Sequence, residues 1–97
     1  MKVATEILNQ LGGNKFLAMT GSHTLCADEK MLKMKLRKNA VRAQWLSITL
    51  NSMDTYDVKF YSVNKNWEVI VKKEFNGVYN DMLVDIFEKT TGLYTKF

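Results

Sequence analysis

The chain has 97 residues, a length typical of one domain, and its 46% hydrophobic and 25% charged residues are the balance of a folded globular protein, which excludes a disordered chain. The single cysteine, Cys26, excludes an intramolecular disulfide, and with only one histidine beside it the chain cannot build a Cys/His zinc site. The formal net charge is +4, no apolar run approaches the ~20 residues of a membrane span, and the N-terminal segment lacks a signal-peptide pattern, so we expect one cytoplasmic domain covering residues 1–97.

An amphipathic helix is expected at the start of the chain. In residues 2–11 the apolar side chains recur at the three- and four-residue spacing of one helical face, and polar side chains take the other face. Gly12 and Gly13 follow directly, where a glycine in the left-handed conformation ends a helix easily. The next apolar stretch, residues 15–20, is short and is closed by Gly21, so we predict a strand there.

Strand patterns dominate the middle of the chain. Residues 24–27 are compatible with a short strand that turns at Asp28 and Glu29. Beyond that turn, apolar and polar side chains alternate with the two-residue period of a half-buried strand. This alternation recurs in four segments: residues 32–37, 45–50, 56–61 and 67–72. The links at 51–54 and 64–66 are rich in turn-forming residues, and Asn76-Gly77 is expected to end the sheet.

A second amphipathic helix is expected near the C-terminus. Apolar side chains from Tyr79 to Phe87 share one helical face, and Gly92 is the expected cap. Residues 93–97 form a short apolar tail that we expect to pack onto the body. The whole pattern predicts an α+β fold of order α-β-β-β-β-β-α. In it, both helices cover one face of an antiparallel sheet of four to five strands, and the other face is open to solvent.

Several segments resemble a known family. LGGNKF (residues 11–16) and AMTG (residues 18–21) resemble the opening of a small uncharacterised family from phages, prophages and other mobile elements. DTY (54–56), KFY (59–61) and TGLYT (91–95) are similar to later segments of the same family, so the resemblance covers nearly the whole chain. It implies a bacterial cytoplasm and a mobile-element setting, and it implies no activity or site.

A cationic strand carries the main functional prediction. Residues 30–42 contain six lysines and arginines and no acid. Lys33, Lys35 and Arg37 are expected on one side of a strand, roughly 6.6–6.8 Å apart. Cations beside exposed aromatic rings can hold single-stranded nucleic acid, because charges follow the phosphates while rings stack on bases. The residues predicted to share this open face and to contact nucleic acid are Lys33, Lys35, Arg37, Trp45, Lys59 and Tyr61.

Other interpretations of the charged residues stay open. Outward lysines also keep a strand soluble and protect a sheet edge from pairing with another chain. The acidic C-terminal helix, or a sheet edge, would suit a protein-interaction module that grips a host or phage protein or associates with itself. Asp57-Val58-Lys59 matches half of a metal-dependent nuclease site, which requires further carboxylates around a divalent cation.

Two further patterns predict no chemistry. His23 and Cys26 are three residues apart and so fall on opposite faces of a strand, and we expect a loop histidine and a small buried thiol. Gly12-Gly13-Asn14-Lys15 follows a helix, whereas a phosphate-binding loop precedes one. We therefore expect a non-enzymatic binding protein that uses no cofactor and no metal.

Overall fold

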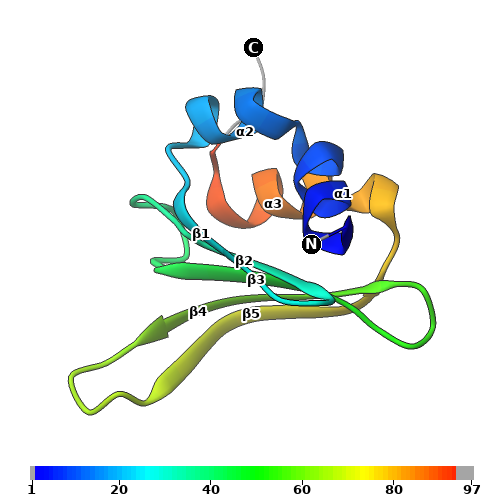
Figure 1. Ribbon diagram of the computed structural model, residues 1–97. Coiled ribbons are helices and arrows are strands. Elements are labelled where there is room, and N and C mark those ends of the chain that lie inside the picture. Colours follow the sequence, from blue (N-terminus) through cyan, green and yellow to red (C-terminus); the bar gives the residue numbers. More distant parts are fainter. Residues whose placement is uncertain (1, 94–97) are drawn as a thin grey trace.

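The structure is a computed structural model that describes residues 2–93, and these residues form a layer of helices on a sheet (Figure 1). The elements are α1 (Lys2–Leu11), α2 (Gly13–Thr20), β1 (His23–Ala27), β2 (Met31–Lys35), β3 (Trp45–Leu50), β4 (Tyr56–Val63), β5 (Val69–Val78), a 3-10 turn η1 (Asn80–Met82) and α3 (Leu83–Thr91). None of the helices in this range is long and apolar enough to cross a membrane.

The sheet is an antiparallel meander in which each strand pairs with its neighbours in the sequence, in the order β1-β2-β3-β4-β5. The helices lie on one side of the sheet, and the far end of the β4–β5 hairpin extends past them (Figure 1). The predicted α+β class, with an antiparallel sheet and helices at both ends, is confirmed.

The hydrophobic core lies between the helices and the inner face of the sheet. Alternation along β3 buries Leu46 and Ile48, and Phe60 of β4 is buried beside them. Phe87 of α3 packs edge-on against Phe16 of α2 at 4.9 Å between ring centroids, and its ring lies 6.4 Å from that of Phe60. One aromatic side chain therefore joins α2, α3 and the sheet.

The predicted strand at residues 15–20 is wrong, because this segment forms α2. Phe16 and Thr20, four residues apart, are both buried on one helical face, and the Thr20 hydroxyl donates to the Phe16 carbonyl oxygen (2.8 Å). Gly12, at φ 125°, separates α1 from α2, and Gly21 caps α2 in the left-handed conformation. The chain thus begins with two helices, and the segment that was compatible with a strand at 24–27 is strand β1.

Several predicted boundaries also differ in the structure, and β5 runs through Asn76 and Gly77, which were expected to end the sheet, to Val78. β2 ends at Lys35, so Arg37 lies in the connection to β3. β5 begins at Val69, so Trp67 belongs to the hairpin turn. Tyr79, expected on the buried face of the last helix, precedes η1 and is 63% exposed. Leu93 packs against the core as expected, while the rest of the predicted tail lies outside the described residues.

Candidate nucleic-acid interface

The open face of the sheet is organised by the pairing of β2, β3, β4 and β5. Because Cα partners in an antiparallel sheet place their side chains on the same face, the register sets which side chains are neighbours. One row across the face consists of Lys35, Trp45, Tyr61 and Val71, and the next consists of Lys33, Ser47, Lys59 and Glu74. No helix covers these rows, because the helices pack on the opposite face (Figure 1).

Trp45 is the centre of the first row. The ammonium nitrogen of Lys33 lies 5.1 Å from the centroid of the indole ring, and that of Lys35 lies 5.9 Å from it. Both distances are within the range in which a cation is attracted to the ring quadrupole. Two positive charges therefore lie beside the indole ring on the open face.

These side chains line a groove of about 540 Å³ on the open face, beside the turn of the β4–β5 hairpin. We call it the basic–aromatic groove. Its lining residues are Lys33, Lys35, Gln44, Trp45, Tyr61, Val63, Asn64, Lys65 and Trp67. Four of the six predicted contact residues, Lys33, Lys35, Trp45 and Tyr61, thus share one concave surface. Lys65 and Trp67 complete it from the hairpin turn, and the sequence analysis did not assign them to the site.

The turn that presents Trp67 is held by Asn64. The Asn64 side-chain oxygen accepts hydrogen bonds from the backbone N–H groups of Asn66 (2.9 Å) and Glu68 (3.0 Å). The Trp67 N–H donates to the Asn64 carbonyl oxygen (3.1 Å), and the Asn64 N–H donates to that of Glu68 (3.1 Å). This network closes a five-residue turn from 64 to 68 and leaves Trp67 86% exposed.

Trp67 has φ 64°, which is unusual for a bulky side chain. The β3–β4 turn, residues 51–55, has the same hydrogen-bond pattern, with Asn51 in the place of Asn64 and Asp54, at φ 60°, in the place of Trp67. Aspartate is one of the residues that tolerate the left-handed region, whereas tryptophan is not. Such local strain occurs preferentially at functional positions.

Arg37 lies beside the groove and does not line it. Its side chain packs over Gly21, where a Cβ atom would come within 2.6 Å of the Arg37 Cδ. Arg37 lines a neighbouring hollow of about 230 Å³ formed by the 36–44 connection. We call residues 36–44 the basic loop, since it also carries Lys38 and Arg42. Lys35 and Gln44 line both hollows, so positive charge continues from the groove onto this loop.

Asn39 fixes the shape of the basic loop. Its side-chain nitrogen donates to the carbonyl oxygens of Arg37 and Ala43 (2.8 Å each), and its side-chain oxygen accepts from the Ala43 N–H (3.2 Å). The loop is also tied to α3, because the Ala40 N–H donates to the Thr91 carbonyl oxygen (2.9 Å). The arginines and lysines of the loop are therefore carried by a defined backbone.

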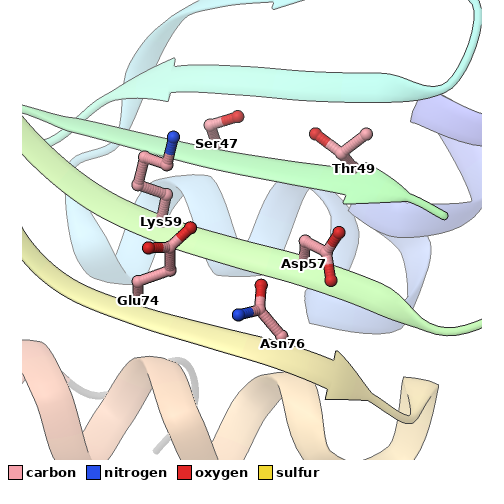
Figure 2. A pocket seen from close by; sticks show the side chains of 6 residues that line it. All are labelled: Ser47, Thr49, Asp57, Lys59, Glu74 and Asn76. Atoms are coloured by element: carbon pink, nitrogen blue, oxygen red, sulfur yellow. The ribbon is translucent and has the colours of Figure 1, made fainter.

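Lys59 lies on the open face but belongs to a different hollow. Figure 2 shows it in a polar hollow of about 210 Å³ on strands β3, β4 and β5. The lining residues are Ser47, Thr49, Asp57, Lys59, Glu74 and Asn76. Glu74 is the Cα partner of Lys59, so a carboxylate stands next to this ammonium group. Lys59 therefore lies on the predicted open face with Trp45 and Tyr61, but in a separate hollow, and its contact with nucleic acid stays a prediction.

The acids of the polar hollow bear on the nuclease interpretation. Asp57 and Glu74 come from adjacent strands. The sequence analysis did not predict that the Glu74 carboxylate would lie near Asp57-Val58-Lys59. The Asp57 carboxylate already accepts from the Asn51 side-chain nitrogen (3.1 Å) and from the Gly77 N–H (3.4 Å). Over residues 2–93, no group of three or more acids, histidines or cysteines is close enough to hold a metal ion.

His23 and Cys26 both lie on the edge strand β1 and are exposed, so the expected buried thiol is wrong. The His23 Nδ1 atom is 2.7 Å from the Thr24 hydroxyl, and the Cys26 thiol donates weakly to the Thr24 carbonyl oxygen at 3.9 Å. Each side chain thus contacts Thr24.

Turn geometry was the signal that could have revealed Trp67 in the sequence. Asn51 and Asn64 each begin a link between alternating strands, and the residue three positions later takes the left-handed conformation in both. Alternation alone extends the last strand back to Trp67 and hides this parallel.

No family model, no curated protein and no solved structure shows a significant match to this chain.

Proposed function

We propose that this protein is a non-enzymatic accessory protein of a phage or other mobile element and binds single-stranded nucleic acid in the basic–aromatic groove. The observation that supports this most directly is Trp67, an indole that is 86% exposed, held in an unfavourable backbone conformation, and placed in one groove with Lys33, Lys35 and Lys65. The mobile-element setting rests on the resemblance of residues 11–16 and 18–21 to such a family.

In this proposal the lysines hold phosphates and the rings hold bases. Lys33, Lys35 and Lys65 supply positive charge along the groove, and Trp67 and Tyr61 offer rings on which unpaired bases can stack. Stacking on an aromatic ring requires a base that is free of its duplex neighbours, which favours single strands over double strands. Because every base has an aromatic face, such binding depends little on sequence.

The charge distribution favours one path for the bound strand. Asp57 and Glu74 repel phosphates on the side of the polar hollow, whereas the basic loop attracts them on the side of Lys35 and Gln44. A strand that enters at the hairpin turn is therefore expected to pass Trp45 and to leave over the basic loop, where Arg37, which was predicted as a contact, would still meet a phosphate.

A salt titration of oligonucleotide binding tests this function. With three or four phosphate contacts, the affinity of a labelled single strand, measured by fluorescence anisotropy, should fall with salt with a log–log slope of roughly −2 to −3. Changing Lys33 and Lys35 together to Gln should make the slope shallower by roughly 1.4, since each lost contact removes about 0.7.

Lys59→Gln is the matched control, because Lys59 lies on the same face but outside the groove. It should leave the slope unchanged. No binding at low salt, or equal effects of the control and the groove variants, would contradict the proposed function.

A protein-interaction module for a host or phage protein is the second candidate. It is favoured by the apolar side chains exposed on β5, since aromatic and aliphatic residues form the centre of protein interfaces. This candidate predicts that a protein partner is lost when β5 is changed and is unaffected by Lys33→Gln and Lys35→Gln.

A further inference from the structure

The free half of the β4–β5 hairpin exposes apolar side chains on both of its faces. It extends past the helices (Figure 1), and Val69, Ile70 and Val71 are 58%, 42% and 46% exposed. Successive strand residues point to opposite faces, so Val69 and Val71 lie on one face of this segment and Ile70 lies on the other. An apolar strand at the edge of a sheet is a template for pairing with another strand.

The backbone of this segment has free hydrogen-bonding groups on its outer edge. The Asn64 N–H donates to the Glu68 carbonyl oxygen, so residues 64 and 68 form a hydrogen-bonded pair. Hydrogen-bonded and non-hydrogen-bonded pairs alternate in an antiparallel ladder, which makes Ser62 and Ile70 the next bonded pair. The N–H and C=O groups of Val69 and Val71 therefore point away from β4, toward the edge.

We propose that two copies of this chain pair through β5, antiparallel, with Ile70 opposite Ile70 of the second copy. Val69 of each copy then faces Val71 of the other, and the outward backbone groups of these valines bond reciprocally. Glu68 of each copy faces Lys72 of the other. Apolar side chains thus oppose apolar ones and the acid opposes a base, on both sides of a twofold axis.

Neighbouring registers lack this complementarity. With Val71 opposite itself, Glu68 meets Glu74 of the second copy and Ile70 meets Lys72. With Lys72 opposite itself, like charges stand face to face at the centre, which is destabilising. The charges on β5 therefore select one register.

The other edge of the sheet is less suited to pairing. Thr24 of β1 has φ 54°, and the β1–β2 register is irregular between His23 and Cys26. β5 is also irregular, but its register with β4 is continuous from Val69 to Val71 and shifts only beyond that stretch, at Lys72, whereas the irregularity of β1 lies in the middle of a five-residue strand. This confines the proposed contact to β5.

The twofold axis of this pairing is perpendicular to the sheet, so both open faces look to the same side. Val69 and Val71 share a face with Tyr61 and Val63, whose side chains line the basic–aromatic groove. The two grooves would therefore flank the contact on one continuous surface. The pairing itself does not require nucleic acid, so its test does not depend on the proposed function.

Cysteine cross-linking in the free protein tests the register. In a Cys26→Ser background, Ile70→Cys places two thiols on directly opposed, non-hydrogen-bonded positions about 4.5 Å apart at Cα, where a disulfide can form. Val71→Cys is the matched control, because its two Cα atoms would be roughly 8–9 Å apart, beyond disulfide reach. A covalent dimer is expected for Ile70→Cys and not for Val71→Cys. Dimer from Val71→Cys instead, or equal dimer from both, would overturn the pairing.

Sedimentation equilibrium tests the association without cross-links. The wild type should change from monomer to dimer between about 10 μM and about 1 mM, as expected for a small interface. Val71→Pro removes one outward N–H and should weaken the dimer at least about tenfold. Lys72→Glu should weaken it as well, and adding Glu68→Lys should restore it. A wild type that stays monomeric over this range, or a double variant that stays as weak as Lys72→Glu, would contradict the proposal.

Discussion

Trp67 shows how one residue can oppose the local preference of the backbone. Its position in the 64–68 turn corresponds to that of Asp54 in the 51–55 turn, and both have positive φ. The left-handed conformation costs an ordinary L-residue roughly 1–2 kcal/mol, which aspartate partly avoids and tryptophan does not. Since the Trp67 ring is exposed, its packing does not offset this cost. Binding of a ligand to the ring would offset this cost.

Replacing Trp67 by glycine should separate stability from binding. Glycine adopts φ 64° without strain, so the free energy of unfolding in urea should stay the same or rise by up to about 1 kcal/mol. The affinity for a single-stranded oligonucleotide should fall by about 1–3 kcal/mol, the contribution of one stacked base.

Asp54→Gly supplies the control for this change, because it alters the same position of the other turn, away from the groove. Its affinity should equal that of the wild type. A Trp67→Gly protein that binds as well as Asp54→Gly would remove Trp67 from the site.

Among the elements, the basic loop depends on a single polar side chain. The three hydrogen bonds of Asn39 span the loop from Arg37 to Ala43, and one of its carbonyl partners, Ala43, is buried. Asn39→Ala leaves these backbone groups without their partners and should lower the free energy of unfolding by about 1–3 kcal/mol in urea denaturation. Lys38→Ala, an exposed change in the same loop, should stay within about 0.5 kcal/mol of the wild type.

The elements also show where alternation and periodicity suffice. Strand patterns predicted β2, β3 and β4 and placed Lys33, Lys35, Trp45 and Tyr61 on the open face, since a half-buried strand repeats every two residues. Helix α2 was missed because the apolar stretch 15–20 is too short to show a helical period, and its buried residues, Phe16 and Thr20, are joined within the helix by the Thr20 hydroxyl.

The predicted site was only partly assembled for similar reasons. Arg37 was assigned to the open face of the strand because alternation continues past Lys35, whereas β2 ends at Lys35 and Arg37 lies in the connection to β3. Lys59 was correctly assigned to the open face, but alternation does not show which residues of neighbouring strands are paired, and the pairing of Lys59 with Glu74 puts it in the polar hollow. The approach of a turn residue such as Trp67 to Tyr61 depends on the twist and length of the hairpin, which no local pattern encodes.

At the scale of the whole molecule, the two layers meet at Phe87. This side chain is almost fully buried and contacts rings from both the helical layer and the sheet. Phe87→Ala should lower the free energy of unfolding by about 3–5 kcal/mol, because it removes a large buried side chain and leaves a cavity. Thermal or urea unfolding followed by circular dichroism measures this loss, and Tyr79→Ala, at an exposed aromatic, should change stability by less than about 1 kcal/mol.

The polar hollow also limits how much polymer one molecule can cover. Asp57 and Glu74 outnumber Lys59 in this hollow, so its net charge is negative, and nucleic acid bound in the groove as proposed would be repelled where it reached this part of β4 and β5. Only a few nucleotides would then fit between this hollow and the basic loop. If the proposed function holds, a long strand would be coated by many molecules, each holding a short segment, and the number bound would grow with the length of the strand while the affinity of each site would not.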